Sequence, residues 1–403
     1  MNNAHPFSPF WKPLVGTALV SFIVGACVRG PAPQSTLKSA SPIASVIDGA
    51  AQAQGGPRAA PIRHAEELQK LSTTFADISR KVTPAVVNIQ SQSVIAGRTL
   101  RDPFSDLFGD EGGGMMREPD RRAQSVGSGV IFDPRGLIVT NNHVIQDAQT
   151  ITVTLSDRRR FSAKLLGTDP DSDVAVLKID GANLPALKWA DSNQLQVGEI
   201  VLAIGSPFNL ASTVTQGIIS AKERRDLGIS AYEDFLQTDA AINPGNSGGA
   251  LVDIEGNLVG INTAILSESR GNQGIGLAIP SRLARKISGQ LTTGGRVTRG
   301  WLGMVVEPVT EDLAAQLGLK TVGGVNVTGI FTRGPAGNLA WSRDGGDIIL
   351  SVNGKPIDSP GQLRNMAADF APGSPVKLEV WQNGHTQTFT IQTAKRPPRV
   401  QGV

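Results

Sequence analysis

The sequence predicts a protein dominated by β-strands, with a β-barrel domain in a chain long enough for two or more domains. Short runs rich in β-branched residues, separated by turn residues, follow one another from Ala85 to about Ile287. Many short strands of this kind are typical of a barrel. A length of 403 residues leaves room for a second domain and terminal segments.

The N-terminal segment, residues 1–28, is predicted to be an export signal or a short membrane anchor. Residues 14–28 form a nearly uninterrupted apolar run between Lys12 and Arg29. This run is shorter than the ~20 residues of a typical membrane-spanning helix, and its length suits the apolar region of a signal peptide. Cys27, the only cysteine, ends the run in a context that resembles a bacterial lipoprotein processing site. The alternative is a chance cysteine in a signal or anchor.

Residues 29–70 are predicted to be a flexible linker, because Ala, Ser, Gln, Gly and Pro dominate the segment. Towards its end, apolar residues recur at helical spacing at Leu68, Leu71, Phe75 and Ile78. This spacing predicts a short amphipathic helix that ends before Pro84.

The barrel region begins at Ala85 and contains several short, often alternating apolar runs. The predicted strands are residues 86–89, 129–132, 137–140, 151–155, 174–179, 200–204 and 259–262. One long interruption, residues 98–124, is charged and glycine-rich. A loop of that length in a compact domain is expected to be mobile or functional.

The overall charge argues against one class of function. The formal net charge is only +3, with a pI of about 9.1, and short basic runs at 158–160 and 395–396 account for much of it. We interpret these runs as solvated surface, so the sequence does not indicate a dedicated nucleic-acid binder.

A serine between glycines is the main candidate for chemistry. The run Asn243-Pro244-Gly245-Asn246-Ser247-Gly248-Gly249 lies directly before an apolar strand. Such a turn exposes the serine, and nearby backbone N–H groups can converge on one point, as an oxyanion hole requires. The alternative is a glycine-rich hairpin whose serine only satisfies the turn.

Serine needs a general base, and the sequence offers one histidine in the right setting. Of the four histidines, only His143 lies inside the strand-rich region. A carboxylate that can orient it, Asp173, directly precedes the apolar run 174–179. The order along the chain is therefore His143, Asp173, Ser247.

This order distinguishes two classes of hydrolase. Residues 245–249 also match the nucleophile elbow of α/β-hydrolases, which include lipases and esterases, but those enzymes run Ser, Asp or Glu, His. The only histidine after Ser247 is His385, in a separate C-terminal segment. Two-barrel serine proteases run His, Asp, Ser, and that template fits.

Three blocks of sequence resemble the catalytic blocks of the HtrA/Deg serine proteases. They are residues 140–144, 172–178 and 245–249, and the resemblance extends over residues 71–394. It implies a two-barrel, chymotrypsin-like protease domain at residues 71–290. It also implies that Ser247 attacks the scissile carbonyl, His143 transfers the proton and Asp173 holds the imidazole, with the N–H groups of Gly245 and Ser247 as the oxyanion hole. No cofactor or metal is expected.

Specificity and regulation can be assigned to candidate residues on the same basis. Ala241, six residues before the nucleophile, is expected at the floor of the primary pocket, with Ile275 and Leu277 on a nearby loop, which suggests small or medium aliphatic substrate side chains. Arg224 is expected in the loop after residues 214–220, where the family places a regulatory arginine. Arg225 is an alternative, and so is a solvated charged turn.

Residues 298–394 resemble an HtrA-type PDZ domain, followed by a basic tail at 395–403. The resemblance implies that Trp301, Leu302, Gly303 and Met304 form the loop that binds a peptide C-terminal carboxylate. An extra residue and Trp341 near the Gly346-Asp347-Ile348 motif are a departure that could reshape the groove. The alternative is a small β-domain that only packs on the protease.

The sequence thus predicts an exported, periplasmic serine endopeptidase that cleaves misfolded or exposed polypeptides. Peptide C-termini are expected to bind the PDZ domain, and the family resemblance implies a homotrimer or a multiple of trimers. Membrane attachment through the N-terminus is an open expectation. Two alternatives remain: a signalling protease that cuts one membrane partner, and a chaperone or scaffold with little turnover.

Overall fold

The computed structural model describes residues 65–95, 99–101, 115–117, 121–207, 212–265, 274–319, 321–342 and 346–397. The predicted export signal, Cys27 and most of the predicted linker lie outside these residues. Among the described residues, we find no helix that is both long enough and apolar enough to span a membrane.

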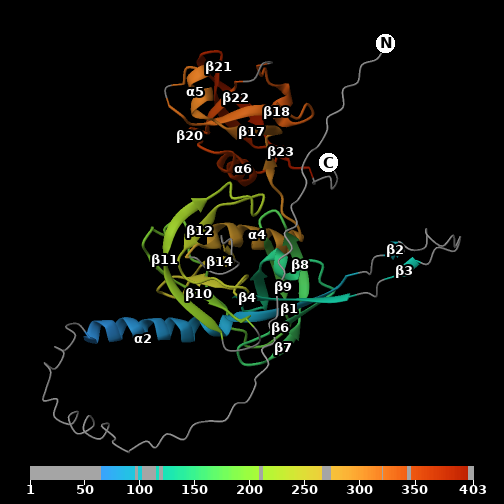
Figure 1. The fold of residues 1–403 in the computed structure, drawn as a ribbon, viewed down its shortest axis with the longest axis vertical. Helices are drawn as coiled ribbons and strands as arrows, with labels where there is room; N and C mark the ends of the chain where they lie inside the picture. Colours follow the sequence, from blue (N-terminus) through green and yellow to red (C-terminus); the bar gives the residue numbers. More distant parts are fainter. Residues whose placement is uncertain are drawn as a thin grey trace, which may run out of the picture. The chain divides into compact units, whose positions relative to one another are not determined.

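The first element in the described part of the chain is the amphipathic helix α2, Ala65–Val82, followed by a 3-10 turn, η2, Thr83–Ala85. Acidic residues lie in its first turn and basic residues in its last turn, which suits the helix dipole. Only its C-terminal end is buried, through Ile78 and Val82, whereas Leu68 and Leu71 are exposed. Figure 1 shows its N-terminal part projecting away from the β-structure. The linker predicted for residues 29–70 was too long, because residues 65–70 are already helical.

The first barrel is an antiparallel sheet whose strand order is β7-β6-β1-β4-β5-β9-β8. Its edge strands β7 and β8 follow one another in the chain and are separated only by Ala163. In β6, Ile151 and Val153 point into the core, as the alternating sequence predicts. The strands are β1 Val86–Ile95, β4 Arg121–Asp133, β5 Leu137–Thr140, β6 Thr150–Thr154, β7 Arg160–Ser162, β8 Lys164–Asp169 and β9 Val174–Lys178.

The predicted long loop at residues 98–124 is shorter in the structure. Two short strands, β2 Thr99–Arg101 and β3 Met115–Arg117, pair with each other. In addition, β4 starts at Arg121, because its pairing with β1 continues as far as Ile95.

The second barrel is closed in the order β10-β11-β12-β15-β14-β13 (Figure 1). Helix α4, Ser281–Gly294, packs Ala284, Ile287 and Leu291 into the core and ends at Gly295. Gly295 has a φ of +66°, and its N–H bonds to the Leu291 carbonyl, which stops the helix. The strands are β10 Ile200–Gly205, β11 Thr213–Arg224, β12 Phe235–Thr238, β13 Ala250–Val252, β14 Leu258–Ile265 and β15 Gly276–Pro280. The all-β, two-barrel prediction is confirmed.

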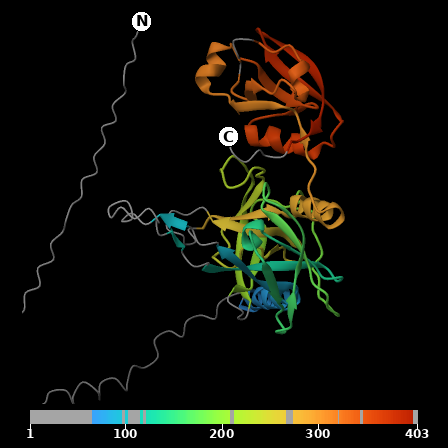
Figure 2. The same ribbon diagram turned by 90° about the vertical axis from the view of Figure 1, so that its right-hand side faces the viewer.

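The C-terminal domain is an α+β unit with its own core. Its sheet runs β17-β18-β19-β21-β22, with β20 paired to β19. In β21, Val376, Leu378 and Val380 alternate into the core. Figure 2 shows its two helices on different sides of the sheet. The elements are β16 Gly300–Trp301, β17 Met304–Pro308, α5 Glu311–Gln316, β18 Val325–Ile330, η4 Pro335–Asn338, β19 Ile348–Val352, β20 Lys355–Pro356, α6 Pro360–Asp369, β21 Pro375–Gln382, β22 His385–Gln392 and β23 Ala394–Lys395.

The basic tail predicted from residue 395 does not begin there. Lys395 belongs to β23, which pairs with β16, and Arg396 forms an ion pair with Asp171 of the protease domain. Strand pairing with a segment 95 positions earlier, at Gly300, is what fixes these residues. Sequence composition alone carries no signal of such a long-range pairing.

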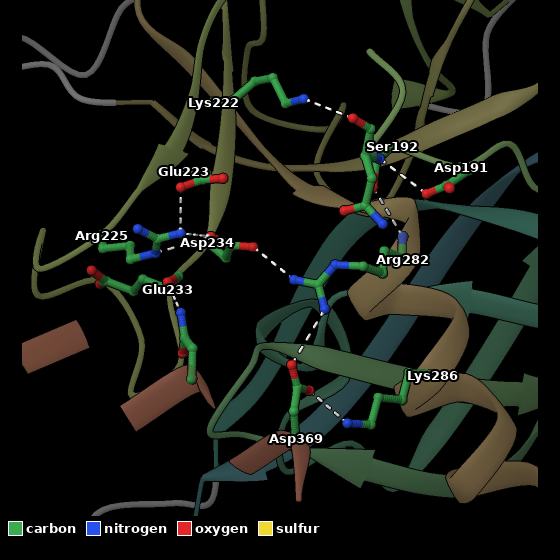
Figure 3. A network of polar contacts seen from close by, with 12 residues as sticks. Asp191, Ser192, Lys222, Glu223, Arg225, Glu233, Asp234, Arg282, Lys286 and Asp369 are labelled. Atoms are coloured by element: carbon green, nitrogen blue, oxygen red, sulfur yellow. Dashed lines mark hydrogen bonds and ion pairs between the residues drawn. The ribbon is translucent and has the colours of Figure 1, made fainter. Parts of the chain in front are cut away.

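Charged side chains connect the two folded domains in the described part of the chain (Figure 3). Asp369 on α6 accepts from Lys286 on α4 at 2.6 Å, and Arg282 bonds to Asp234 at 2.9 Å. Asp234 also pairs with Arg225 at 3.0 Å. Burial raises the pKa of Asp234, whereas the two arginines act in the opposite direction and favour its charged form.

The most buried of these contacts joins Arg299, just before β16, to Asp169 at the end of β8. Arg299 donates from both terminal nitrogens, and the two side chains are only 8% and 7% exposed. Burial opposes the charge of Arg299, but the adjacent Asp169 carboxylate raises the pKa of the guanidinium above its ordinary value.

We expect Arg299→Ala to lower the free energy of unfolding by about 3–5 kcal/mol, because it leaves the Asp169 carboxylate buried without its partner. The measurement is the urea midpoint of the full chain. The paired variant Arg299→Met with Asp169→Leu should lose clearly less, since it removes both charges together. Equal losses in the single and paired variants would contradict this account.

Candidate active site

His143 and Asp173 are brought together by the register of two strands. In the pairing of β5 with β9, Thr140 faces Ala175. The residues just after β5 and just before β9 therefore meet at one end of the sheet. His143 lies in the short helix α3, Asn142–Ile145, and its Nδ1 is 2.7 Å from Asp173 Oδ2. The His143 side chain is 47% exposed and Asp173 only 16%, so the imidazole is accessible while the carboxylate is sheltered.

The Asp173 carboxylate is held by two further donors. The backbone N–H of His143 donates to Oδ1 at 2.9 Å, and Thr263 Oγ1 donates to Oδ2 at 2.8 Å. Thr263 lies on β14, so this bond crosses from the second barrel to the first. The backbone of Asp173 has a φ of +56°, a left-handed conformation that aspartate tolerates better than most residues. This fixes both the position and the orientation of the carboxylate.

Ser247 lies in the turn between β12 and β13, next to Thr263. Its Oγ donates to the Thr263 carbonyl at 3.3 Å. Gly248 follows with a φ of +83°, and a Cβ there would lie 2.1 Å from the Ser128 carbonyl. Any side chain at Gly248 would therefore push the serine turn away from the first barrel. Within the described residues, no acceptor takes up the N–H of Gly245 or of Ser247.

Ser128 on β4 connects the serine turn to the first barrel. Its N–H donates to the Ser247 carbonyl at 2.8 Å, and its Oγ donates to the Gly245 carbonyl at 2.6 Å. Its own carbonyl accepts from Thr140 Oγ1, at the end of β5 and three residues before His143. Sequence reasoning missed both Ser128 and Thr263. The only local signal for Ser128 is its place between Gly127 and Gly129 inside a strand.

The residues predicted to form the specificity pocket do not all have the same environment. Ala241 and Ile275 are both half-buried, and the Ala241 carbonyl accepts from Thr215 Oγ1 at 2.8 Å. Leu277, by contrast, is fully buried in the core cluster that the two barrels share. The expectation that Leu277 lines the pocket was therefore wrong, because β15 turns this side chain into the core.

The predicted regulatory arginine is not in a loop. Arg224 is the last residue of β11 and is exposed, with its Nε bonded to Gln237 on the neighbouring strand at 2.8 Å. The alternative, Arg225, is the first residue after the strand. Its side chain is only 15% exposed and pairs with both Glu223 and Asp234. Burial opposes the charge, but Asp234 raises the pKa of Arg225.

In the C-terminal domain, a groove lies between β17 and α6. Of the predicted carboxylate loop, Trp301 is in β16 and Met304 opens β17, so only Leu302 and Gly303 are irregular. All four residues line the groove, together with Val306, Leu363 and Ala367. Trp341 is not part of it, because its ring packs against Phe389 and its Nε1 bonds to the Ala336 carbonyl. The departure seen in the sequence thus leaves the groove open.

We expect Thr263→Val to reduce kcat/KM of peptide hydrolysis about tenfold. A hydrogen bond to a charged acceptor contributes about 1.5 kcal/mol or more, and the Thr263 hydroxyl is one of the donors to Asp173. Valine keeps the shape, so KM should stay within about twofold. Thr263→Ser, which keeps the hydroxyl, is the matched control and should recover most of the activity. Equal activity of the valine and serine variants would contradict the role assigned to this bond.

The comparisons with known proteins agree with this architecture. The trypsin-like peptidase domain family matches residues 127–261, and the PDZ domain family matches residues 296–393. A probable periplasmic serine endoprotease, DegP-like, of Chlamydia pneumoniae is 40% identical over 379 residues, covering 90% of this chain and 77% of that protein. A DegP-like relative of Pseudomonas putida is 43% identical over 338 residues, covering 80% of this chain and 70% of the relative.

Solved structures give the same result. A variant of the HtrA-type protease AlgW, in a structure with a decapeptide, is 42% identical with a TM-score of 0.69, covering 82% of this chain and 99% of that one. A serine endoprotease from Yersinia pestis is 37% identical with a TM-score of 0.56, covering 80% of this chain and 98% of that one. Sequence identity, domain order and fold together show that this protein belongs to the HtrA family of DegP-like, PDZ-containing serine endoproteases.

Proposed function

We propose that Ser247, His143 and Asp173 form the catalytic triad of this serine endopeptidase. The observation that carries the proposal is the 2.7 Å contact between His143 Nδ1 and Asp173 Oδ2, made beside the Ser247 turn. In this scheme Ser247 Oγ attacks the scissile carbonyl and His143 Nε2 accepts its proton. His143 then returns the proton to the leaving amine, and Asp173 keeps the imidazole in the required tautomer.

The backbone N–H groups of Gly245 and Ser247 would stabilise the tetrahedral oxyanion. Both lie on the serine turn and lack a partner in the described part of the chain. Donors of this kind can bind the oxygen as its charge develops, and losing one typically raises the barrier by about 3 kcal/mol. Ala241 and Ile275 are the residues we propose for the primary pocket, with a preference for small or medium aliphatic side chains.

We propose that the substrates are unfolded or exposed polypeptides in the periplasm, and that peptide C-termini bind the PDZ groove. Strand β17 is an edge strand, so its outer backbone groups can pair with an added peptide strand. The groove beside it is largely apolar, which suits a peptide that ends in apolar residues. The periplasmic location rests on the relatives, which are named periplasmic. Attachment to a membrane through Cys27 or the N-terminal segment remains a proposal.

The second candidate is a gated, signalling protease with one membrane partner. One observation favours a gated resting state. Within the described residues, the Ser247 hydroxyl bonds to the Thr263 carbonyl rather than to His143, so the nucleophile is not yet paired with its base. Peptide binding would then be required before turnover. A chaperone or scaffold role would be a second activity of the same chain.

We further propose a trimer or a multiple of trimers, with α2 in the contact between copies. Leu68 and Leu71 of this helix are 58% and 44% exposed, although they lie on its apolar face. Large apolar side chains on one exposed helix face mark a surface that another chain can cover.

The experiment compares the full chain and its Ser247→Ala variant on casein, with and without a peptide that ends in apolar residues. Casein cleavage that depends on Ser247 and rises with the peptide supports the quality-control proposal together with the PDZ role. Cleavage that the peptide does not change would reject the regulatory role of the groove. No cleavage, together with labelling of Ser247 by a fluorophosphonate, would favour the signalling protease. Absence of labelling would reject the triad, and holding of unfolded casein by the Ser247→Ala variant would support a chaperone role.

A further inference from the structure

Arg396, just after β23, lines the PDZ groove and forms an ion pair with Asp171, in the turn that leads to Asp173. Strand β23 pairs with β16, so Ala394 faces Trp301, and the N–H of Arg396 donates to the Arg299 carbonyl at 3.1 Å. Because β16 leads directly into Leu302 and Gly303, this pairing brings Arg396 to the groove. Arg396 and Pro397 line the same cavity as the predicted carboxylate loop.

The described residues that line the groove include two arginines and no acidic side chain. Among the described residues that line it, the charged side chains are Arg364 and Arg396, and the others are apolar, glycine or the phenol of Tyr232. Arg364 is already engaged, since its Nη1 donates to the Ala231 carbonyl at 2.9 Å. The Arg396 guanidinium, by contrast, binds the side chains of Asp171 and Tyr232 rather than a backbone carbonyl.

The ion pair between Arg396 and Asp171 can be replaced by a contact between Arg396 and another anion. Arg396 Nη1 is 2.8 Å from Asp171 Oδ2 and 2.8 Å from the Tyr232 hydroxyl. Both charged side chains are 24% exposed, three times the exposure of the buried Arg299–Asp169 pair. Solvent weakens the attraction between charges that it reaches, so an incoming anion can compete for the guanidinium. Burial raises the pKa of Tyr232, which keeps its phenol neutral at ordinary pH.

We propose that Arg396 is the side-chain half of the carboxylate site in the PDZ groove. The backbone N–H groups of residues 302–304 would bind one face of the peptide's terminal carboxylate. The Arg396 guanidinium would leave Asp171 and bind the other. The ligand class is a peptide with a free α-carboxylate and an apolar last residue. This inference rests on the proposed binding of peptide C-termini.

The same exchange gives the groove a connection to the protease site. Asp171 lies in the turn between β8 and β9, two residues before Asp173. Its backbone carbonyl accepts from the Tyr232 N–H at 2.9 Å. A peptide carboxylate that binds Arg396 therefore breaks an ion pair made by the turn that holds Asp173. By linkage, weakening the Arg396–Asp171 pair must strengthen peptide binding by the same free energy.

The test measures peptide binding to the full chain in a Ser247→Ala background, which prevents cleavage. Two fluorescent peptides share one sequence ending in Leu-Val, and differ only in a free C-terminal carboxylate or a C-terminal amide. We expect Arg396→Gln to weaken the carboxylate peptide about tenfold, as for loss of one charge-assisted hydrogen bond, and to leave the amide peptide within about twofold. Arg396→Lys should lose less. Asp171→Asn should bind the carboxylate peptide several-fold more tightly, because it releases Arg396.

Lys395→Gln is the matched control, since it removes the same charge from the neighbouring exposed residue. It should leave both peptides within about twofold, which separates a local contact from the general field. Equal weakening of both peptides by Arg396→Gln, or no weakening, would overturn the inference while the groove still binds peptides. If the unaltered groove binds neither peptide, the proposed recognition of C-termini fails first. Thermal unfolding of each variant verifies that it is folded.

Discussion

Replacing Ser247 with alanine is expected to lower kcat for peptide hydrolysis about a millionfold, which is the cost of losing a serine nucleophile. Ser247 Oγ makes a 3.3 Å hydrogen bond to the Thr263 carbonyl and is only partly buried. The substitution therefore removes one weak contact. The midpoint temperature of unfolding should shift by less than about 1 °C, in line with other surface changes. The substitution is thus predicted to abolish catalysis and to leave the stability of the fold nearly unchanged.

The measurement is hydrolysis of casein by the full chain, with fluorophosphonate labelling followed by mass spectrometry. Labelling should occur at Ser247 and disappear in the variant. Ser156→Ala, an exposed serine in the turn after β6, is the matched control and should retain full activity. Residual turnover above about a hundredth of the original rate, or labelling at another serine, would show that Ser247 is not the nucleophile.

Replacing Asp173 with asparagine should cost about 10⁴-fold in kcat. An amide can keep the side chain in place by accepting from the His143 N–H, now 2.9 Å from Oδ1. It can also adopt the left-handed backbone at this position, where φ is +56°. An amide carries no negative charge. At the position of Oδ2 it also cannot accept both from the protonated His143 Nδ1 and from Thr263 Oγ1. The imidazole then loses its required tautomer and the stabilisation of its cation.

Steady-state hydrolysis of a peptide substrate measures this effect, and fluorophosphonate labelling should slow in parallel. Asp180→Asn, two residues past the end of β9, is the control: Asp180 is exposed and pairs with Lys178. That variant should keep normal activity. A loss of less than tenfold in the Asp173 variant would mean that His143 is oriented by other groups.

The candidate catalytic residues could be predicted from the sequence because they are embedded in short local patterns. Ser247 stands in a glycine-rich turn, and His143 and Asp173 each adjoin a predicted strand. Their order along the chain was enough to choose between two hydrolase templates. The strands themselves were readable where apolar residues alternate, as in residues 151–155.

The supporting contacts were not readable, because they depend on which strands pair and in which register. Ser128 binds the serine turn across 119 positions of sequence, to Ser247, and Thr263 reaches Asp173 from the other barrel. Leu277 was misplaced for a related reason. A residue near a loop can belong to the pocket or to the core, and only the face that its strand presents decides between them.

The amino-acid sequence by itself determined the strand-rich fold class, the family and the identity of the candidate triad, since local pattern and residue chemistry carry that information. Tertiary structure alone decided which residues hold the triad in place, and it placed Arg396 against both the PDZ groove and Asp171. The physical reason is distance along the chain. Hydrogen bonds and ion pairs between residues 90 or more positions apart exist only after the strands have paired, and no local preference of the chain anticipates them.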